Sequence, residues 1–404
     1  MSQHYAVIIV GGGIVGATAA CALAQAGIDV ALIDARNPER QWPAKPVDIR
    51  VSALTRASQN ILQAVGVWPA MQQRGVGAYE HMHVWDAQSS GVLHFDAAET
   101  EFPVLGHIVE NRVTVASLWD KLETLPAASL ICPSTVADLE INSEQAVVHL
   151  DNGQALTAEL VIAADGRDSA LRTMVGIQTA GWEYKQSGLV ATVSTEKSHR
   201  QTAWQHFLPE GPLAFLPLVN GQCSIVWTLS IARAQHYVNL AEEAFLQELE
   251  QALESKLGQV LTVGPRAAFA LRFQYAKQYT HERFVLIGDA AHAMHPLAGQ
   301  GANAGLLDAA AIAELIIKAD RLGRPIGSHK LLRRYERWRK GDNLAMMSSM
   351  DVINKMYAQQ NDVFRQLRGT GMSLINHSGW LKNYFNHYAM GLRDDLPAMA
   401  STVS

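Results

Sequence analysis

Short apolar runs that end on glycine or aspartate recur along the chain and predict its main elements. The first run covers residues 6–10, and a glycine-rich turn follows at residues 11–16. Small residues continue over 17–26, and a second apolar run at 30–33 ends on Asp34. This order predicts a buried strand, a helix and a second, parallel strand.

Two later apolar runs end on the same kinds of residue. Residues 160–164 precede Asp165, and residues 284–287 precede Gly288 and Asp289. Open α/β sheets bind ligands at the carboxyl ends of their strands. We therefore expect the three strand ends to meet at one edge of a sheet, in a domain that is discontinuous in sequence.

The pattern changes between the second and the third of these strand ends. Alternating apolar residues at 204–208, 213–218 and 224–229 predict antiparallel strands. Residues 240–257 predict a helix, and longer helices are expected over 306–321 and 331–357. The predicted fold class is α/β, with a discontinuous Rossmann-like domain, an inserted antiparallel β-sheet domain and C-terminal helices.

These patterns divide the chain of 404 residues into three parts. The nucleotide-binding domain is assigned to residues 1–75, 102–180 and 275–340, the substrate domain to 76–101 and 181–274, and a C-terminal helical region to 341–404.

Composition removes several functional classes. The chain is 48% hydrophobic and 18% charged, a globular balance that argues against disorder. The net charge of -5 gives no electrostatic reason to expect a nucleic acid partner. The three cysteines lack CxxC or metal-site spacing, so we expect free thiols in a reducing, cytoplasmic compartment.

Two apolar stretches resemble membrane spans in hydropathy alone. The stretch at residues 6–33 contains the glycine turn, and no lysine or arginine precedes Arg36, so the basic start of a signal peptide is missing. The stretch at 302–317 contains Asp308 and Glu314. Buried elements of a globular protein explain both stretches better.

The segment at residues 11–16 reads GGGIVG and matches the dinucleotide motif GxGxxG. Gly11 permits a tight turn, Gly13 lets the backbone approach a pyrophosphate, and Gly16 lets the helix pack on the strand. Asp34 stands at the end of the next strand, where it would accept hydrogen bonds from ribose hydroxyls. The motif predicts a dinucleotide site but does not separate NAD from FAD.

The third strand end opens a longer motif, GDAAH, followed by a proline and a run of glycines. Its candidate residues are Gly288, Asp289, His295, Pro296, Gly299, Gly301 and Asn303. An acid at a strand end suits a ribityl hydroxyl, and a glycine-rich helix start suits the polar edge of an isoalloxazine. Asp289, His292 and His295 could instead be metal ligands, but no further ligand has suitable spacing, so we expect no metal there.

Taken in order, the motifs GxGxxG, DGxxSxxR and GDAAHxxHPxxGQGxNxG resemble those of the class A flavoprotein aromatic hydroxylases, the group of para-hydroxybenzoate hydroxylase. The resemblance covers almost the whole chain. The segments DIRVSAL, GHIVEN and FLPL resemble the ubiquinone-biosynthesis branch. Within that branch, VWD, CSIVW and RYER are most similar to the 2-polyprenylphenol hydroxylases, with the demethoxyubiquinol hydroxylases close behind.

This resemblance implies an FAD-dependent monooxygenase that hydroxylates the ring of a polyprenylated phenol in ubiquinone biosynthesis. In the family, NAD(P)H binds transiently and reduces FAD, and a flavin C4a-hydroperoxide formed with O₂ transfers an oxygen atom to the ring. The resemblance implies FAD contacts for Gly11, Gly13, Gly16, Asp34, Arg112, Asp165, Gly288, Asp289, Pro296, Gly299, Gly301 and Asn303.

Three residues are catalytic candidates on the same basis. Arg50 stands at a family arginine position near the flavin, although a surface salt bridge would explain it equally well. His295 and Pro296 would lie beside the flavin ring, where Pro296 would shape the pocket for the reacting oxygen. No residue stands out as a general base.

Apolar residues at helical spacing over 374–392 predict a C-terminal helical surface. Packing against the chain's own domain or a second subunit explains it more simply than peripheral contact with the inner membrane. The expected partners are the polyprenylated phenol and O₂, and a homo-oligomer or a complex with other ubiquinone-biosynthesis proteins stays open. The alternative functions are a demethoxyubiquinol or methoxyphenol hydroxylase of the same pathway, an FAD-dependent isoprenoid reductase and a flavin-bearing scaffold subunit.

Overall fold

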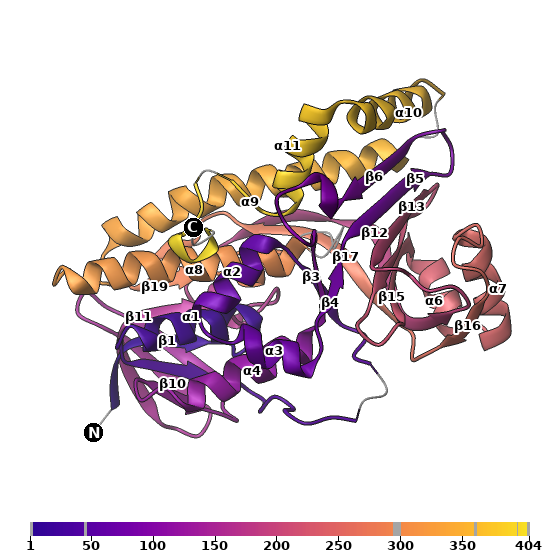
Figure 1. Cartoon of the computed structure of the whole chain (residues 1–404). Helices are drawn as coiled ribbons and strands as arrows, with labels where there is room; N and C mark the ends of the chain where they lie inside the picture. Colours follow the sequence, from indigo (N-terminus) through magenta and orange to yellow (C-terminus); the bar gives the residue numbers. More distant parts are fainter. Residues whose placement is uncertain (1–2, 44–46, 294–299, 359–361, 394, 402–404) are drawn as a thin grey trace.

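The computed structural model describes residues 3–43, 47–293, 300–358, 362–393 and 395–401. Two large sheets lie side by side, and the helices that follow the last strands run along both of them (Figure 1).

The first sheet is built around parallel strands, in the order β18-β19-β11-β1-β2-β8. The pairs that join β19, β11, β1, β2 and β8 are all parallel, and β10 and β9 extend β11 as antiparallel strands. The strands are β1 (Gln3–Val10), β2 (Val30–Ile33), β8 (Ala128–Ile131), β9 (Val136–Ile141), β10 (Ala146–Leu150), β11 (Ala155–Ala163), β18 (Thr280–His281) and β19 (Phe284–Leu286).

Helices pack on this sheet through small residues. Helix α1 (Ile14–Gln25) contacts α4 (Asn111–Glu123) and α8 (Gln300–Arg321). Its Ala17, Ala19 and Ala20 are fully buried, so neighbouring backbones can approach closely. The central strands are apolar at nearly every position because they are buried on both faces.

The second sheet has the order β20-β17-β12-β15-β14-β13-β5-β6, with β16 beside β12. Its strands are β5 (His81–Asp86), β6 (Val92–Asp96), β12 (Thr179–Thr195), β13 (Thr202–Leu208), β14 (Gly211–Pro217), β15 (Cys223–Ser230), β16 (Val260–Val263), β17 (Ala267–Ala276) and β20 (His292–Ala293). One face packs on α6 (Ile231–Asn239) and α7 (Glu242–Ala252), which lie at one end of the molecule in Figure 1.

A small sheet connects the two large ones. It contains β3 (Val51–Leu54), β7 (Gly106–Glu110) and β4 (Gly77–Tyr79), in this order. In the sequence, α2 (Arg56–Ala64) and α3 (Trp68–Arg74) connect β3 to β4. Strand β4 lies in the segment assigned to the substrate domain, yet it pairs with β7 of the nucleotide-binding segment. The two regions therefore share this sheet, and the assigned domain boundaries stay a prediction.

The C-terminal third is helical. Helix α9 (His329–Ala358) has 30 residues and so spans about 45 Å. It is followed by α10 (Asp362–His377), which packs on β6, and by α11 (Gly379–Ala389). Of the apolar residues expected on this surface, Leu374, Trp380 and Tyr384 are exposed, whereas Leu392 packs against a buried cluster. Within the described residues, no helix combines the length and the apolarity needed to cross a membrane.

The α/β class predicted from sequence is confirmed, but several details differ. The run at 160–164 belongs to the longer strand β11, and the helix expected at 240–257 is the shorter α7, preceded by α6. Strands β5 and β13 are parallel, unlike the other pairs that join the strands of the second sheet. The chain visits the first sheet between these two strands, which gives a parallel pair its long connection. All three cysteines are free, and Cys132 is only half-buried.

A buried charge network fastens α9 to the end of β19. Asp308 of α8 accepts hydrogen bonds from Gly288 N at 3.1 Å, His292 Nε2 at 2.5 Å and Arg339 Nε at 2.9 Å. Burial alone would raise the pKa of Asp308, but the neighbouring His292 and Arg339 outweigh this effect and hold the pKa at about 2. Asn343 of α9 adds a fourth donor at 3.2 Å.

We predict that Asp308→Asn lowers the free energy of unfolding by roughly 3 kcal/mol, because it removes the buried partner of Arg339 and leaves the exposed Asp342 to pair with this buried charge. Urea unfolding followed by circular dichroism measures the change. Asp320→Asn, at an exposed position of the same helix, is the matched control. Equal stability of the two variants would contradict the prediction.

The same interaction gives stability a pH dependence. The pKa of Asp308 in the folded protein, about 2, lies below its ordinary value of 3.8. Its contribution to stability is therefore fully present above about pH 4 and is lost as the pH falls towards 2. In the Asp308→Asn variant this part of the acid dependence should be absent.

Candidate active site

Four adjacent parallel strands bring the three motifs to one edge of the first sheet. Gly11 N donates to Ile33 O at 2.8 Å, Ala164 N donates to Val10 O at 2.8 Å, and Ile287 N donates to Ala163 O at 3.0 Å. The pairing thus continues to the last residues of β1, β2, β11 and β19. The loops that follow these strands lie side by side, as the sequence predicts.

Glycine is needed where these loops touch. Gly11 has a φ of +106°, and a Cβ atom on it would lie 2.3 Å from Ala164 O. A Cβ atom on Gly16 would lie 1.9 Å from Gly11 O. Val15 of the first motif packs against Gly288 and Gly305 of the third, where Cβ atoms would lie 3.2 Å and 2.5 Å from its side chain. Larger residues would push the motifs apart.

Gly13 differs from the other glycines of its motif because nothing lies within 4 Å of the position of a Cβ atom. Gly13 is also the N-cap of α1, and no side chain caps this helix. The free N–H groups and the positive end of the helix dipole therefore face open space, which suits a phosphate group.

Asp34 is held at the end of β2 by the glycine turn. Its Oδ2 accepts from Gly12 N at 2.6 Å, and its Oδ1 accepts from Arg36 N at 2.9 Å. Trp119 of α4 donates from Nε1 to Gly12 O at 2.7 Å and closes the other side of the turn. The sequence analysis missed Trp119 because a single buried tryptophan on a helix carries no motif.

Asp165 offers a polar atom that the protein itself does not use. Its Oδ2 accepts from Leu171 N at 3.2 Å, whereas its Oδ1 is buried and has no hydrogen-bond partner among the described residues. A buried carboxylate oxygen without a partner is costly, so its position at a strand end suits a hydroxyl group of a ligand. Nearby, Arg172 donates to Ala290 O at 2.8 Å and to Arg167 O at 2.9 Å, so the arginine of DGxxSxxR ties the second motif to the third.

Asp289 lies next to the start of α8, since a Cβ atom on Gly301 would be 3.9 Å from its Oδ1. Its side chain lines a cavity and is exposed there, although neighbouring protein atoms partly desolvate the carboxyl group. This partial desolvation raises the pKa of Asp289, and His292 and Arg167 oppose the shift.

Other predicted residues have protein partners of their own. Arg112 binds Glu110 through Nε at 2.8 Å and lies over the Trp42 ring at 4.7 Å. Asn303 is buried and accepts from Thr55 N at 3.0 Å, so its side chain fixes the end of β3.

His292, named above as a possible metal ligand, is buried and bound through Nε2 to Asp308. His295, Pro296 and Gly299 lie outside the described residues.

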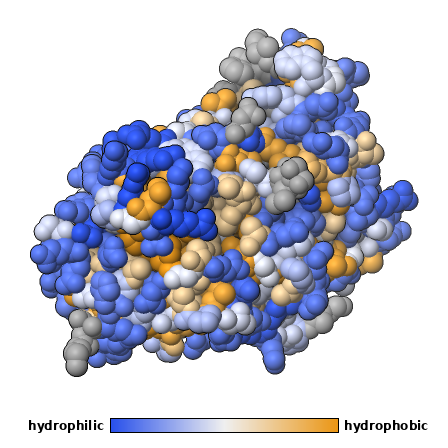
Figure 2. Space-filling view, turned by 60° about the vertical axis from the view of Figure 1, so that its left-hand side comes forward, coloured by the Kyte–Doolittle hydropathy of each residue, from blue (hydrophilic) through white to orange (hydrophobic). Residues whose placement is uncertain are grey.

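A cavity of about 960 Å³ opens beside Asp289 and extends to α11. This volume is at the upper end of the range for ligand sites, roughly 300–1,000 Å³. Figure 2 shows apolar side chains gathered in a band across one face of the molecule, between polar regions. The walls of the cavity are mostly apolar and include Val190, Leu216, Val226, Leu271, Met346 and Ile353.

The second sheet forms the floor of this cavity through one of its two faces. On β14, Leu213 and Phe215 point into the core beneath α6 and α7, whereas Ala214 and Leu216 line the cavity. On β15, Trp227 belongs to the core and Val226 to the cavity. This alternation is the signal that could have identified the wall residues from sequence.

Charged and polar groups gather at the end of the cavity nearest the first sheet. Arg50 lines it and stacks over Phe269 at 5.3 Å, and it forms no ion pair within the described part of the chain. Arg167 and Asp168 also line it and lie 3.7 Å apart. Burial raises the pKa of Tyr79 to about 12, so this phenol stays protonated on the wall. The site can hold an anionic cofactor beside an apolar ligand.

Comparison with known proteins agrees with this geometry. Residues 4–348 match the FAD binding domain family. The chain is 39% identical over 385 residues to a ubiquinone hydroxylase, UbiL, of Rhodospirillum rubrum, an alignment that covers 95% of this chain and 89% of the relative. It is 36% identical over 391 residues to the 3-demethoxyubiquinol 3-hydroxylase of Escherichia coli, with 97% and 100% covered.

Among solved structures, p-nitrophenol 4-monooxygenase from Pseudomonas putida superimposes with a TM-score of 0.79 and 18% identity, and covers 98% of this chain and 100% of its own. At that identity the similarity speaks for the fold alone. The match to the FAD binding domain and the two close relatives carry the assignment, and the orphaned Asp165 oxygen and the open helix end at Gly13 fit the cofactor. The chain belongs to the FAD-dependent monooxygenases, among the hydroxylases related to ubiquinone biosynthesis.

Proposed function

We propose that this enzyme hydroxylates the aromatic ring of a polyprenylated phenol, with the phenol ring at the cofactor end of the cavity and the prenyl chain along its apolar length. The observation that carries the proposal is the cavity itself. It is mostly apolar and about 960 Å³ in volume, and its walls include Asp289 as well as Tyr384 and Tyr388 of α11. A small, polar substrate would leave the apolar part of this cavity unused.

The cofactor contacts follow from the edge of the first sheet at which the three motifs meet, which we call the cofactor edge. The pyrophosphate of FAD would lie at Gly13 and the start of α1, where the N–H groups are uncapped. Asp34 would accept from the adenosine ribose, and the unpaired Oδ1 of Asp165 and the carboxylate of Asp289 would accept from other hydroxyl groups of the cofactor.

Bound FAD, once reduced by a transient NAD(P)H, supplies the activation of O₂. The protein's own contribution is placement and dryness. The apolar walls on β12, β14, β15 and α9 exclude water from the ring of the phenol, which protects a reactive oxygen species from side reactions. Arg50 and Arg167 place positive charge at the end of the cavity where a phenol or phenolate oxygen would lie.

Two steps of the pathway fit this arrangement. The resemblance of VWD, CSIVW and RYER favours hydroxylation of a 2-polyprenylphenol. The relative named 3-demethoxyubiquinol 3-hydroxylase, which is 36% identical, favours hydroxylation of the ring of a later pathway intermediate instead. Both rings carry a prenyl chain, so the apolar cavity supports the two candidates equally.

Cells that lack this protein should accumulate the prenylated precursor of the blocked step, and its ring substitution then distinguishes the two candidates. The purified enzyme should consume O₂ and NAD(P)H faster when that precursor is added, and turnover should stop without O₂. An unchanged quinone profile, together with no stimulation by any prenylated phenol, would rule the proposal out. Turnover that continues without O₂ would indicate a reductase.

Gly13→Val should remove most of the bound FAD without unfolding the protein. A Cβ atom on Gly13 has no neighbour within 4 Å among the described residues and φ is -69°, so a valine fits the backbone while its side chain occupies the place assigned to the pyrophosphate. The ratio of flavin to protein absorbance after reconstitution should fall by roughly tenfold or more, a loss of at least about 1.4 kcal/mol of binding energy.

Gly341→Val is the matched control, since this helical glycine also has no neighbour within 4 Å of its Cβ position and lies on α9, away from the cofactor edge. Full flavin occupancy in Gly13→Val would show that the pyrophosphate lies elsewhere.

Ala214→Trp should block the substrate while leaving the cofactor bound. Ala214 is half-buried on the floor of the cavity, and an indole there would fill space that a long prenyl chain needs. We expect stimulation of NAD(P)H oxidation by a long-chain prenylphenol to fall by roughly tenfold or more, as for the loss of a few buried methylene contacts.

Stimulation of NAD(P)H oxidation by a phenol with a single prenyl unit is the internal control, and it should fall much less. Equal losses for the long and short substrates would argue against a prenyl chain along the sheet.

A further inference from the structure

Strands β5 and β6 carry a second group of chemistry-bearing side chains, on the face opposite the cavity. In this antiparallel pair, His81 lies opposite Asp96 and His83 opposite His94. Side chains alternate along a strand, so all four project from one face. The other face carries Met82 and Phe95, which line the cavity.

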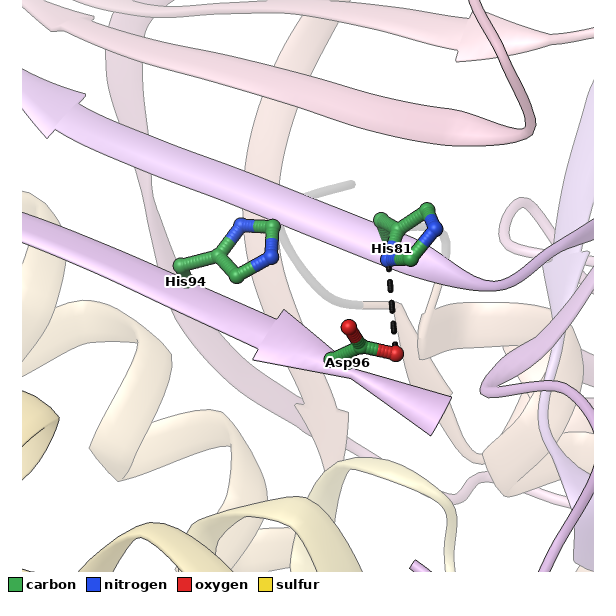
Figure 3. Close-up of side chains that lie close together, drawn as sticks. All are labelled: His81, His94 and Asp96. Atoms are coloured by element: carbon green, nitrogen blue, oxygen red, sulfur yellow. Dashed lines mark ion pairs between the residues drawn. The ribbon is translucent and has the colours of Figure 1, made fainter. Parts of the chain in front are cut away.

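Three of these side chains converge. One ligand atom from each of His81, His94 and Asp96 lies within 4.8 Å of the other two, and all three residues are half-buried. Figure 3 shows the two imidazoles and the carboxylate close together on β5 and β6, with His81 paired to Asp96. His81 Nδ1 and Asp96 Oδ1 are 3.4 Å apart, and the two imidazole rings are nearly parallel, with centroids 5.8 Å apart.

We propose that His81, His94 and Asp96 bind a divalent transition-metal ion, with Zn²⁺ as the best fit. Two imidazole nitrogens and one carboxylate oxygen are typical donors for Zn²⁺, and three protein ligands leave a fourth position for water. Bonds of about 2.0–2.1 Å require ligand atoms about 3.3 Å apart, so small side-chain rotations complete the site. Half-buried side chains at the edge of a sheet have room for such rotations.

The position of the site assigns it a structural role. A metal at this point would join β5 to β6, and these two strands form a wall of the cavity through Met82 and Phe95. The backbone N–H of His94 also donates to Asn376 Oδ1 of α10 at 3.2 Å, which joins β6 to that helix. A metal would therefore fix the cavity wall and the seat of α10 without touching the cofactor edge.

His83 provides a matched comparison because it is a neighbouring histidine outside the three-residue group. Its ring packs against Trp85 at 5.4 Å and Trp204 at 5.2 Å. Its ring also lies 6.0 Å from the ring of His94, but it does not belong to the group of three converging ligand atoms. Replacing His83 thus removes an imidazole from the same face and leaves the proposed ligands in place.

Zinc binding to the FAD-loaded enzyme tests the proposal directly. The protein is stripped of metal with EDTA, its flavin absorbance is checked, and Zn²⁺ is added in a calorimetric titration. The wild-type protein and His83→Gln should bind one equivalent more than His81→Ala/His94→Ala. Loss of an outer partner of a metal site already costs roughly 10–100-fold in affinity, so loss of two ligands should cost at least that.

Asp96→Asn guards against an unfolded double variant, since it changes one charge and keeps the shape of the side chain. It should retain FAD and bind Zn²⁺ at least roughly tenfold more weakly than the wild type. Zn²⁺ should also raise the unfolding temperature of the wild type and of His83→Gln, but not that of the double variant. Equal zinc affinity in all four proteins, or no stoichiometric binding by the wild type, would overturn the proposal.

Discussion

The close approach of backbones at the ends of β1 and β11 is the constraint on which the rest of the structure depends. Gly11 and Ala164 are so near that a Cβ atom on Gly11 would lie 2.3 Å from the Ala164 carbonyl oxygen. This contact holds the first and second motifs together, and Val15 holds the third motif through Gly288 and Gly305. A dinucleotide site assembled from three distant segments requires this alignment, because a displacement of any one loop would separate the protein groups that contact the dinucleotide.

The second sheet serves two purposes through its two faces. The face that packs on α6 and α7 carries the large residues of a core, such as Phe215 and Trp227. The opposite face carries smaller residues, such as Gly188 and Ala214, and thereby leaves a cavity instead of filling it. Helix α9 closes that cavity with Met346 and Ile353, flexible or branched apolar groups that suit a hydrocarbon ligand.

Much of the nucleotide-binding half could be predicted because local sequence determines it. The glycines of GGGIVG and the acids at the strand ends have fixed roles in a parallel sheet, so Gly11, Gly16 and Asp34 were found by spacing alone. The cavity could not be found in this way, since residues such as Arg50, Ala214 and Tyr384 meet only through tertiary packing. For the same reason the sequence does not show that His292 is buried, because its partner Asp308 lies 16 residues later, within α8.

The bond between Arg339 and Asp308 has a mechanical consequence. Arg339 stands on α9 two turns before Met346, and Asp308 in turn holds the amide of Gly288. Helix α9 thus carries part of the cavity wall and, through Asp308, also holds the loop that presents Asp289. Any shift of this wall is therefore transmitted to the loop, so the shape of the cavity and the position of Asp289 are mechanically coupled.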